Sequence, residues 1–348
     1  MFRFHDTMKR VAVAATAAAF ILGGSSLATA QEQTLTIATP GAALHFYPFY
    51  VAEAGGLFAE EGIKLDWVDV GAGSRQIAAV AGGSAQVAIV GMQPAITARQ
   101  NGADLVVVAS LFNAYPIQLV LSNAALEKTG IKPEMSIDEK VERLNGVSIA
   151  VTGIGSTTDV MLRSWLIARG KNPEEALTIQ PLGNPGAMYA AFQQGAIDGF
   201  VLGAPHPEQA ETDGLGKLVI DPLDGSVPEV NGVPYTGVIV NGSLVEQNAE
   251  LIEKITRVVA KAIKLIADDP KAASAHVKTF FPQTDSALFD SFEPKYQVNA
   301  AKTPVISREA YDKLIEWIKI TAETEPTVTY DDFVVSSFAE KAEAEILK

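Results

Sequence analysis

Two short turns of the type Gly-x-Gly-Ser could bind a ligand through main-chain atoms. They are Gly71–Ser74 and Gly153–Ser156, and each stands where a predicted strand gives way to a predicted helix. The first N–H groups of a helix lack partners within it and the helix dipole is positive there, which favours a negative group such as sulfonate, nitrate or carboxylate. The alternative is that the two serines only cap their helices. Neither turn continues as a dinucleotide fingerprint or a P-loop, which argues against nucleotide sites of those kinds.

Side chains near these turns could add to a binding site. Arg75 follows the first turn and could supply a fixed positive charge with two parallel donors, although an arginine in the first turn of an exposed helix is more often solvated. His206 stands between two prolines and is either a ligand contact or an exposed loop histidine. Phe46 or Tyr47, next to His45, could wall a pocket for a planar or aliphatic body.

The elements that must position these residues occur twice, because the chain is similar to itself at an offset of 112 residues. Identities at this offset include Ile37/Ile149, Gly83/Gly195, Gly91/Gly203 and Gly102/Gly214. Periodicity predicts strands over 35–39, 63–70, 86–90 and 105–110, and again over 147–151, 177–182 and 197–201. Helices are predicted between them, beginning at Pro48, near Ser74 and at Pro94, and over 157–169 and 187–194. Alternation of this kind implies α/β lobes with a parallel, doubly wound sheet.

Two segments connect the predicted lobes. Residues 117–122 cross from the first lobe to the second, and 234–241 form a strand-like stretch that returns. We therefore expect a first lobe of residues 31–117 plus 241–348, a second lobe of 118–240, and a two-segment hinge. Helices over 249–267 and from Ser307 to about Thr324 should pack on the lobes.

Ligands of open α/β sheets bind beyond the carboxyl ends of the strands, so two such lobes should form a cleft there. Its expected ligand-binding residues come from both lobes and from the crossings: His45, Phe46, Tyr47, Ser74, Arg75, Met92, Gln93, Asn113, Tyr115, Thr152, Ser156, Thr157, Thr158, Asn184, His206 and Tyr235. Asp159 is expected in the first turn of its helix, and Asp198 as a structural carboxylate.

The first thirty residues have the pattern of a secretory signal peptide. Arg3, Lys9 and Arg10 precede an apolar run over 11–22, and Ala28-Thr29-Ala30 is a small-x-small cleavage signal before Gln31. We expect removal of residues 1–30 near Ala30/Gln31 and a periplasmic, soluble product. The chain has no cysteine, which excludes disulfides, thiolate metal sites and a cysteine nucleophile.

Charge excludes several classes of partner. The expected mature chain has 24 basic and 40 acidic residues, about −16, which disfavours nucleic acid and anionic lipid. No cofactor or metal motif is present, and neither is a His-Glu-x-x-His or Gly-x-Ser-x-Gly motif. The interpretation is a monomeric binding protein rather than an enzyme.

Several longer motifs carry a resemblance to a known family. They are Phe49-x-x-Ala52-x-x-x-Gly56-Leu57-Phe58, Leu144 to Ala150 followed by Gly155-Ser156-Thr157, and Ala190-Ala191-Phe192-x-x-Gly195-x-Ile197-Asp198-Gly199. In these the chain resembles the solute-binding proteins of ABC importers in the nitrate, sulfonate, taurine and thiamine-precursor group, the NMT1/THI5-like superfamily. It departs from the family at Gln86, where many relatives carry Asp, and at Ala204-Pro205-His206.

The resemblance implies a type II periplasmic binding protein with a Venus-flytrap closure. Such a protein would capture a small organic or inorganic anion of the sulfonate, taurine or nitrate kind and deliver it to a membrane permease with its ATPase. The departures leave taurine, alkanesulfonate, nitrate and aromatic substrates all open, and the same transport role for a pyrimidine or aromatic substrate is an alternative. An exported enzyme on the same fold, or a sensor subunit that presents ligand to a membrane kinase, remains as an alternative.

Overall fold

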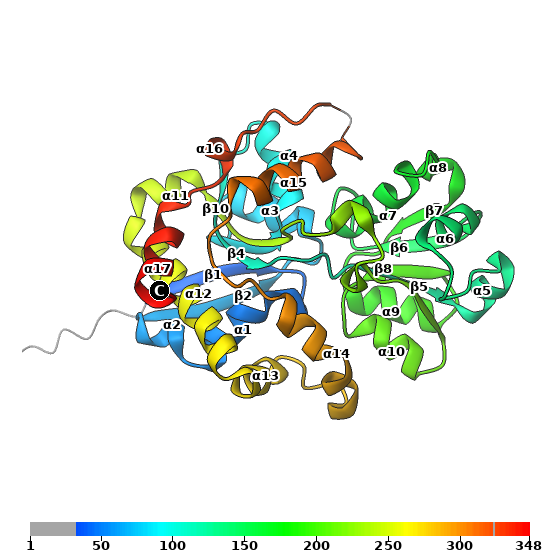
Figure 1. Cartoon of the computed structure of the whole chain (residues 1–348), viewed down its shortest axis with the longest axis horizontal. Helices are drawn as coiled ribbons and strands as arrows, with labels where there is room; N and C mark the ends of the chain where they lie inside the picture. The colour runs from blue at the N-terminus through cyan, green and yellow to red at the C-terminus, as the bar shows by residue number, and fades with distance from the viewer. Residues whose placement is uncertain (1–32, 323) are drawn as a thin grey trace, which may run out of the picture. The chain divides into compact units, whose positions relative to one another are not determined.

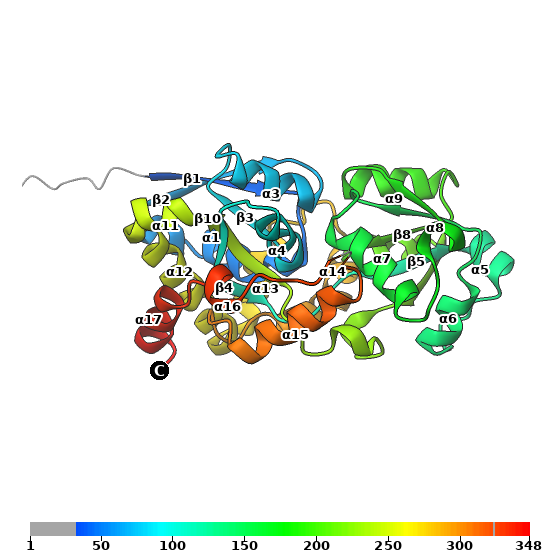
Figure 2. The same cartoon turned by 90° about the horizontal axis from the view of Figure 1, so that it is seen from above.

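The computed structural model describes residues 33–322 and 324–348 (Figure 1), so the predicted signal peptide and its cleavage point lie outside the described residues. The described part contains two five-stranded sheets, which lie apart in both views (Figure 2). Helices lie on the faces of both sheets. No helix among these residues is long and apolar enough to cross a membrane.

The first sheet has the strand order β2-β1-β3-β10-β4. Its strands are β1 (Gln33–Thr39), β2 (Ile63–Asp69), β3 (Val87–Gly91), β4 (Leu105–Phe112) and β10 (Thr236–Asn241). The helices between its first four strands are the 3-10 turn η1 (Leu44–Phe46), α1 (Tyr47–Ala54), α2 (Leu57–Glu60), α3 (Gly73–Ala81) and α4 (Met92–Gln100). After β10 the chain continues in helices α11 (Gly242–Gln247), α12 (Ala249–Asp268), α13 (Pro270–Lys278), α14 (Ser286–Asn299), α15 (Arg308–Lys319), α16 (Tyr330–Phe333) and α17 (Ser337–Ile346).

The second sheet repeats the first, with the order β7-β6-β8-β5-β9. Its strands are β5 (Gln118–Ser122), β6 (Ser148–Val151), β7 (Thr178–Pro181), β8 (Gly199–Leu202) and β9 (Gly216–Ile220). Its helices are α5 (Asn123–Thr129), α6 (Ile137–Arg143), α7 (Thr157–Ile167), α8 (Pro173–Ala176), α9 (Pro185–Gln193) and α10 (His206–Thr212), with 3-10 turns η2 (Pro222–Asp224) and η3 (Pro228–Val230) after β9. Strand for strand the two orders match, so the sequence duplication is a structural duplication.

Both sheets are mixed rather than wholly parallel, and the prediction of purely parallel sheets is wrong at two strands. β10 runs antiparallel to β3 and β4, and β5 runs antiparallel to β8 and β9. These are the two strands that follow a crossing between the sheets, and a chain arriving from the opposite sheet enters from the other end. Residues 118–122 are therefore a full strand of the second sheet and more than a connection.

Local boundaries differ from the sequence prediction in small ways. Helix α3 begins at Gly73 with Ala72 as its N-cap residue, so Ser74 is not a cap. Helix α15 ends at Lys319, before the predicted end near Thr324. Asp198 acts as expected, since its carboxylate accepts the Ser148 N–H at 2.8 Å.

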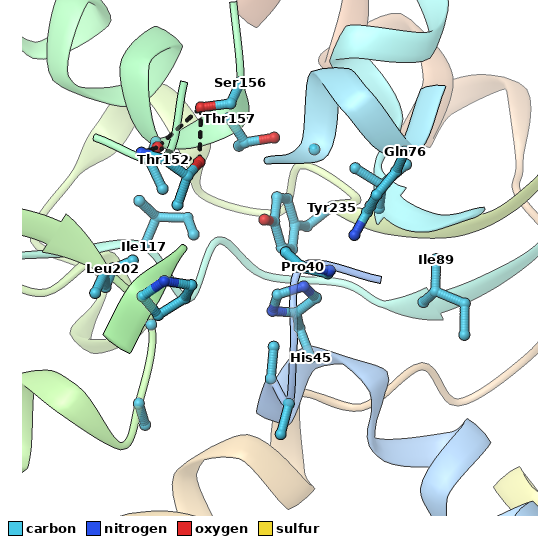
Figure 3. Close-up of a pocket in the computed structure, with 18 of the residues that line it drawn as sticks. Pro40, His45, Gln76, Ile89, Ile117, Thr152, Ser156, Thr157, Leu202 and Tyr235 are labelled. Carbon is cyan, nitrogen blue, oxygen red and sulfur yellow. Dashed lines mark hydrogen bonds between the residues drawn. The ribbon is translucent and has the colours of Figure 1, made fainter. Parts of the chain in front are cut away.

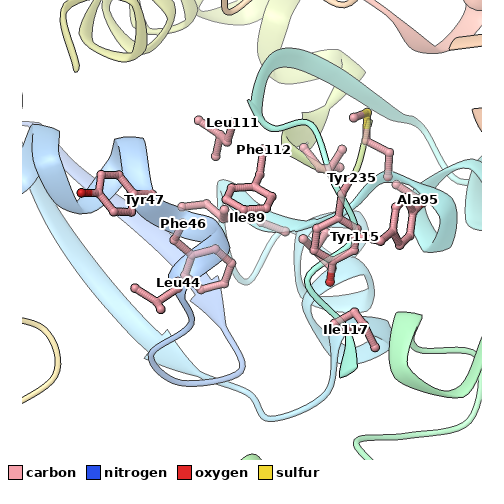
Figure 4. Packing of buried hydrophobic residues seen from close by; sticks show 14 of the residues in the cluster. Leu44, Phe46, Tyr47, Ile89, Ala95, Leu111, Phe112, Tyr115, Ile117 and Tyr235 are labelled. Atoms are coloured by element: carbon pink, nitrogen blue, oxygen red, sulfur yellow. The ribbon is translucent and has the colours of Figure 1, made fainter. Parts of the chain in front are cut away.

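The hydrophobic core continues from the first sheet through the crossings. Tyr115 lies in the segment between β4 and β5, and its ring packs on Tyr235 and Trp317 with centroids 4.8 and 4.7 Å apart. Figure 4 shows Tyr115 beside Tyr235, together with Phe112 and Ile117. Helix α14 joins the sheets from the other side, because the Tyr296 hydroxyl accepts the main-chain N–H of Ala204 at 2.8 Å. The crossings are thus held in a packed apolar layer next to the cleft.

Candidate functional site

A cavity of about 600 Å³, part of it open to solvent, lies between the two sheets (Figure 3). It forms beyond the carboxyl ends of β1, β3, β6 and β8, as the strand-end argument predicts. The residues that line it come from both halves of the chain: Pro40, Ala42, Ala43, His45, Gly73, Gln76, Ile89, Val90, Ile117, Thr152, Ser156, Thr157, Thr158, Pro185, Leu202, Gly203, Ala204, His206 and Tyr235. A cavity of this size suits a small solute.

The two walls of the cavity touch each other at its edge. A Cβ atom added to Gly153, in the turn before α7, would lie 2.9 Å from the Cβ of Ala72, which precedes α3. One added to Gly91, at the end of β3, would lie 2.6 Å from the Thr157 hydroxyl. Because contacts this close leave no room for a side chain, both positions need glycine for the walls to meet. The structure is therefore closed over the cavity.

The turn into α7 forms one wall and is held by its own hydroxyl groups. The Thr152 hydroxyl lies 3.0 Å from both the Ser156 and the Thr158 hydroxyls, and these two are 2.9 Å apart. Ser156 also donates to the Gly153 carbonyl at 2.6 Å instead of capping a helical N–H. Since these hydroxyls satisfy one another, the group left to meet a ligand is the buried Thr157 hydroxyl. It lies close to the Tyr235 phenol but makes no hydrogen bond of good geometry with the described residues.

Asp159 offsets part of the positive end of α7. Its carboxylate is almost fully buried, accepts the Gly155 N–H at 2.8 Å and pairs with the Arg163 Nε at 2.8 Å. This agrees with the expectation that Asp159 stands in the first helical turn. A carboxylate already placed there weakens the attraction of this helix end for an anionic ligand.

Gln76 is the most conspicuous polar residue of the opposite wall. It lies on α3, is fully buried, and neither its Nε2 nor its Oε1 has a hydrogen-bond partner among the described residues. Figure 3 shows its amide facing the space that His45 and Tyr235 border. A buried amide with two unpaired atoms destabilises the ligand-free protein. Such a cost is expected of a residue that binds a ligand and not of one that only packs in the core.

The two histidines of the cavity are neutral. Burial lowers the pKa of His45 to about 3 and that of His206 to about 4, so neither ring carries a charge near neutral pH. Burial also raises the pKa of Tyr235, whose phenol stays protonated. The His45 ring stands edge-on to Tyr235 with centroids 5.1 Å apart. No lysine, arginine, aspartate or glutamate is among the residues that line the cavity.

An outer cleft continues from the cavity toward solvent. It shares Pro40, Ala42, Pro185 and His206 with the inner cavity and is bordered by Asp69, Asn184 and the segment 280–284 after α13. The Asn184 side chain is the N-cap of α9, where it accepts the Ala187 N–H at 2.9 Å. This outer part forms the entrance side of the site.

Seven of the sixteen sequence-predicted site residues line the inner cavity: His45, Thr152, Ser156, Thr157, Thr158, His206 and Tyr235. Asn184 lies in the outer cleft. Ser74 and Arg75 lie at the edge between the sheets, where the Arg75 guanidinium comes within 3.5 Å of a Cβ built on Gly183.

The remaining six lie outside both parts of the cleft. Phe46, Met92 and Tyr115 are core residues, Tyr47 bonds the Glu293 carboxylate, Gln93 donates to Thr97, and Asn113 is exposed. An aromatic residue near a strand end can pack in the core or line a pocket, so the residue type alone could not predict which of the two it does.

Sequence reasoning missed Gln76 and the apolar residues Ile89, Val90, Ile117 and Leu202, which line the cavity. A usable signal existed for Gln76, since it is a polar residue beside Ile77 on the buried side of a helix whose other buried residue is Val80. Ile117 and Leu202 are apolar residues at strand boundaries and carry no signal that distinguishes them from core.

This architecture defines a class of protein: two α/β lobes that enclose a small ligand cavity between them. A family model described as the NMT1-like family matches residues 28–280, and the chain belongs to this family. The resemblance predicted from the sequence motifs is thereby confirmed.

Two curated relatives are similar in sequence. YtlA of Bacillus subtilis (strain 168), which is named as a binding protein, is 23% identical over 90% of this chain and 92% of its own length. The taurine-binding periplasmic protein of Escherichia coli (strain K12) is 31% identical over 50% of this chain and 49% of its own length. Both are named for binding.

Solved structures share the fold. A protein of Bordetella bronchiseptica RB50 superposes with a TM-score of 0.80 at 20% identity, covering 91% of this chain and 99% of the other. The alkanesulfonate-binding protein SsuA of Xanthomonas axonopodis pv. citri, bound to MOPS, gives 0.67 at 16% identity over 88% and 100%. The two-lobe α/β fold predicted from the sequence is therefore confirmed.

Proposed function

We propose that this chain is the periplasmic substrate-binding component of an ABC importer. It closes two lobes, one built on the first sheet, which includes β10, and one built on the second sheet, on one small solute and delivers it unchanged to a membrane permease driven by a separate ATPase. The observation that carries this proposal is the closed cavity, whose walls come from both halves of the duplication and meet at Gly153 and Ala72. A ligand that touches both walls can do so only in the closed form, so binding shifts the hinge equilibrium toward that form.

Relatives and cavity favour different solutes. The taurine-binding and alkanesulfonate-binding proteins named above support a sulfonate-like anion, and nitrate belongs to the same predicted class. The uncharged lining of the cavity instead supports a neutral solute, the alternative that includes pyrimidines and aromatic compounds. The apolar contacts offered by Ile117, Leu202 and Ile89 fit an organic body in either case.

The role is tested by export and by coupling to a permease. The full-length chain is expressed in a Gram-negative host, and the periplasmic fraction is analysed by N-terminal sequencing, with Gln31 expected as the first residue. The mature protein is then added to proteoliposomes that contain a candidate ABC permease and its ATPase, and ligand-dependent stimulation of ATP hydrolysis is expected. Retention in the cytoplasm, or turnover of a solute by the chain alone, would contradict the proposal.

A further inference from the structure

We propose that Gln76 selects the ligand and that the ligand is a neutral organic solute with an amide-like edge, in which one hydrogen-bond donor and one acceptor stand side by side. This inference rests on the proposed binding role and names the chemical class that the same cavity takes.

The first evidence is the state of the Gln76 amide. Both its polar atoms are buried and both lack a partner among the described residues. One of them can only donate and the other can only accept, whichever way the amide is turned. A ligand edge with one acceptor and one donor satisfies both atoms at once, in the manner of a carboxamide pair.

An acceptor-only ligand fits this residue poorly. A sulfonate, nitrate or ionised carboxylate can receive a bond from Nε2 but offers nothing to Oε1, which would stay buried and unpaired. A buried carbonyl left in that state opposes binding, and sites built around hydrogen-bonding groups reject ligands that leave them unpaired. Gln76 therefore discriminates against oxyanions of the same size.

The charge of the cavity points the same way. None of its lining residues carries a formal charge, and burial lowers the pKa of His45 and His206 so that both rings are neutral. At the α7 end, the Asp159 carboxylate already occupies the first turn. A bare anion would lose its hydration without gaining a counter-charge from the lining. The remaining polar groups, Tyr235 and Thr157, are hydroxyls that can donate or accept.

The ligand class is tested with two matched series of probe compounds. One is propanamide, propanoate and ethanesulfonate, and the other is benzamide, benzoate and benzenesulfonate. Each is titrated into the full mature protein by isothermal calorimetry and thermal shift at pH 7.5. The amide of at least one series should bind about ten-fold or more tightly than both its anions. Tighter binding of either anion, or no binding of either amide, would overturn the inference.

Gln76 variants separate selection from structural support. Gln76→Met should weaken amide binding about ten-fold or more without lowering the melting temperature of the ligand-free protein, because it removes two unpaired buried atoms. Gln76→Glu should gain benzamidine, because the amidinium cation pairs with the ionised carboxylate through two parallel N–H donors. The control is Gln118→Met, a buried glutamine outside the cavity lining whose amide donates to Glu208. It should change stability and leave amide affinity within about two-fold.

The outcomes distinguish this inference from the proposed function. Unchanged amide affinity in Gln76→Met, or no gain of benzamidine in Gln76→Glu, would overturn the role of Gln76. If an anion binds and stimulates the permease, the inference fails while the importer role stands. If an amide binds as expected and the permease does not respond, the inference stands and the importer role fails.

Discussion

Closure of the lobes can be tested by a single methyl group at Gly153. In Gly153→Ala the new Cβ would stand 2.9 Å from the Cβ of Ala72 on the opposite wall. Ordinary carbon contacts begin near 3.5–4.0 Å, so this edge of the cleft must open by about 0.6–1.1 Å. Gly153 does not have a positive φ, and alanine is therefore acceptable to the backbone itself.

The expected effect is on binding rather than on folding. Overpacking of this kind costs about 1–3 kcal/mol, and here the cost falls on the closed form alone, so ligand affinity should drop roughly 5- to 150-fold. The assay is isothermal calorimetry with whichever of the six probe compounds binds most tightly. Small-angle scattering should show that saturating ligand compacts the variant less than the parent.

The matched control moves the methyl group from one wall to the other. Ala72→Gly combined with Gly153→Ala keeps one methyl at the contact, and the double variant should recover most of the lost affinity. If the double variant binds as weakly as Gly153→Ala, or if Gly153→Ala lowers ligand-free stability as much as it lowers affinity, the closure argument is refuted.

Three further predictions concern titration and charge. Burial raises the pKa of Glu208 to about 7, so this carboxyl contributes stability below about pH 4.5 that is lost as the pH rises to 7. Relative to the parent, the free energy of unfolding of Glu208→Gln, measured in urea, should therefore rise by up to about 3 kcal/mol between pH 5 and pH 8. Burial lowers the pKa of His45 to about 3, so below about pH 6.5 the unfolded chain binds a proton that the folded protein does not bind, and the parent loses stability. Relative to the parent, the free energy of unfolding of His45→Gln should therefore rise by about 1.4 kcal/mol for each pH unit from 6.5 down to 4.5 in urea unfolding. Arg163→Met removes the partner of the buried Asp159 and should cost about 2–3 kcal/mol in urea unfolding, whereas Glu174→Gln, which removes the exposed partner of the same arginine, should cost less than about 1 kcal/mol.

Periodicity and self-similarity predicted most of the fold. The offset of 112 residues relates α3, which begins at Gly73, to α9, which begins at Pro185, and the start of β3 at Val87 to the start of β8 at Gly199. Local pattern could not give the direction of β5 and β10. A strand's hydrophobicity is the same whether it runs with or against its neighbours, and its direction depends on which sheet the chain comes from.

The candidate site was predicted where main-chain geometry determines it and missed where packing does. Thr152 and Thr157 belong to a turn of small polar residues after a strand, and that pattern places them at the cavity. Phe46 and Tyr47 have the right position and the wrong direction, because the first packs near Trp67 and the second bonds Glu293. Whether such a side chain points into the cleft or into the core depends on how the start of its helix is rotated. That rotation is set by tertiary contacts, which a single sequence does not show.

The duplication also explains why the two Gly-x-Gly-Ser turns do not form a symmetrical pair. By fold position, the counterpart of Gly71 is Gly183, which also has a positive φ and faces Arg75 across the cleft. The counterpart of α7 is α1, which begins at Tyr47 and Pro48; the turn before it contains one glycine, Gly41, and lacks the Gly-x-Gly-Ser pattern. The site is therefore asymmetric: α7 contributes the Thr157 hydroxyl from one lobe, and α3 contributes the Gln76 amide from the other. A ligand that contacts both the Thr157 hydroxyl and the Gln76 amide would therefore meet different groups at its two ends.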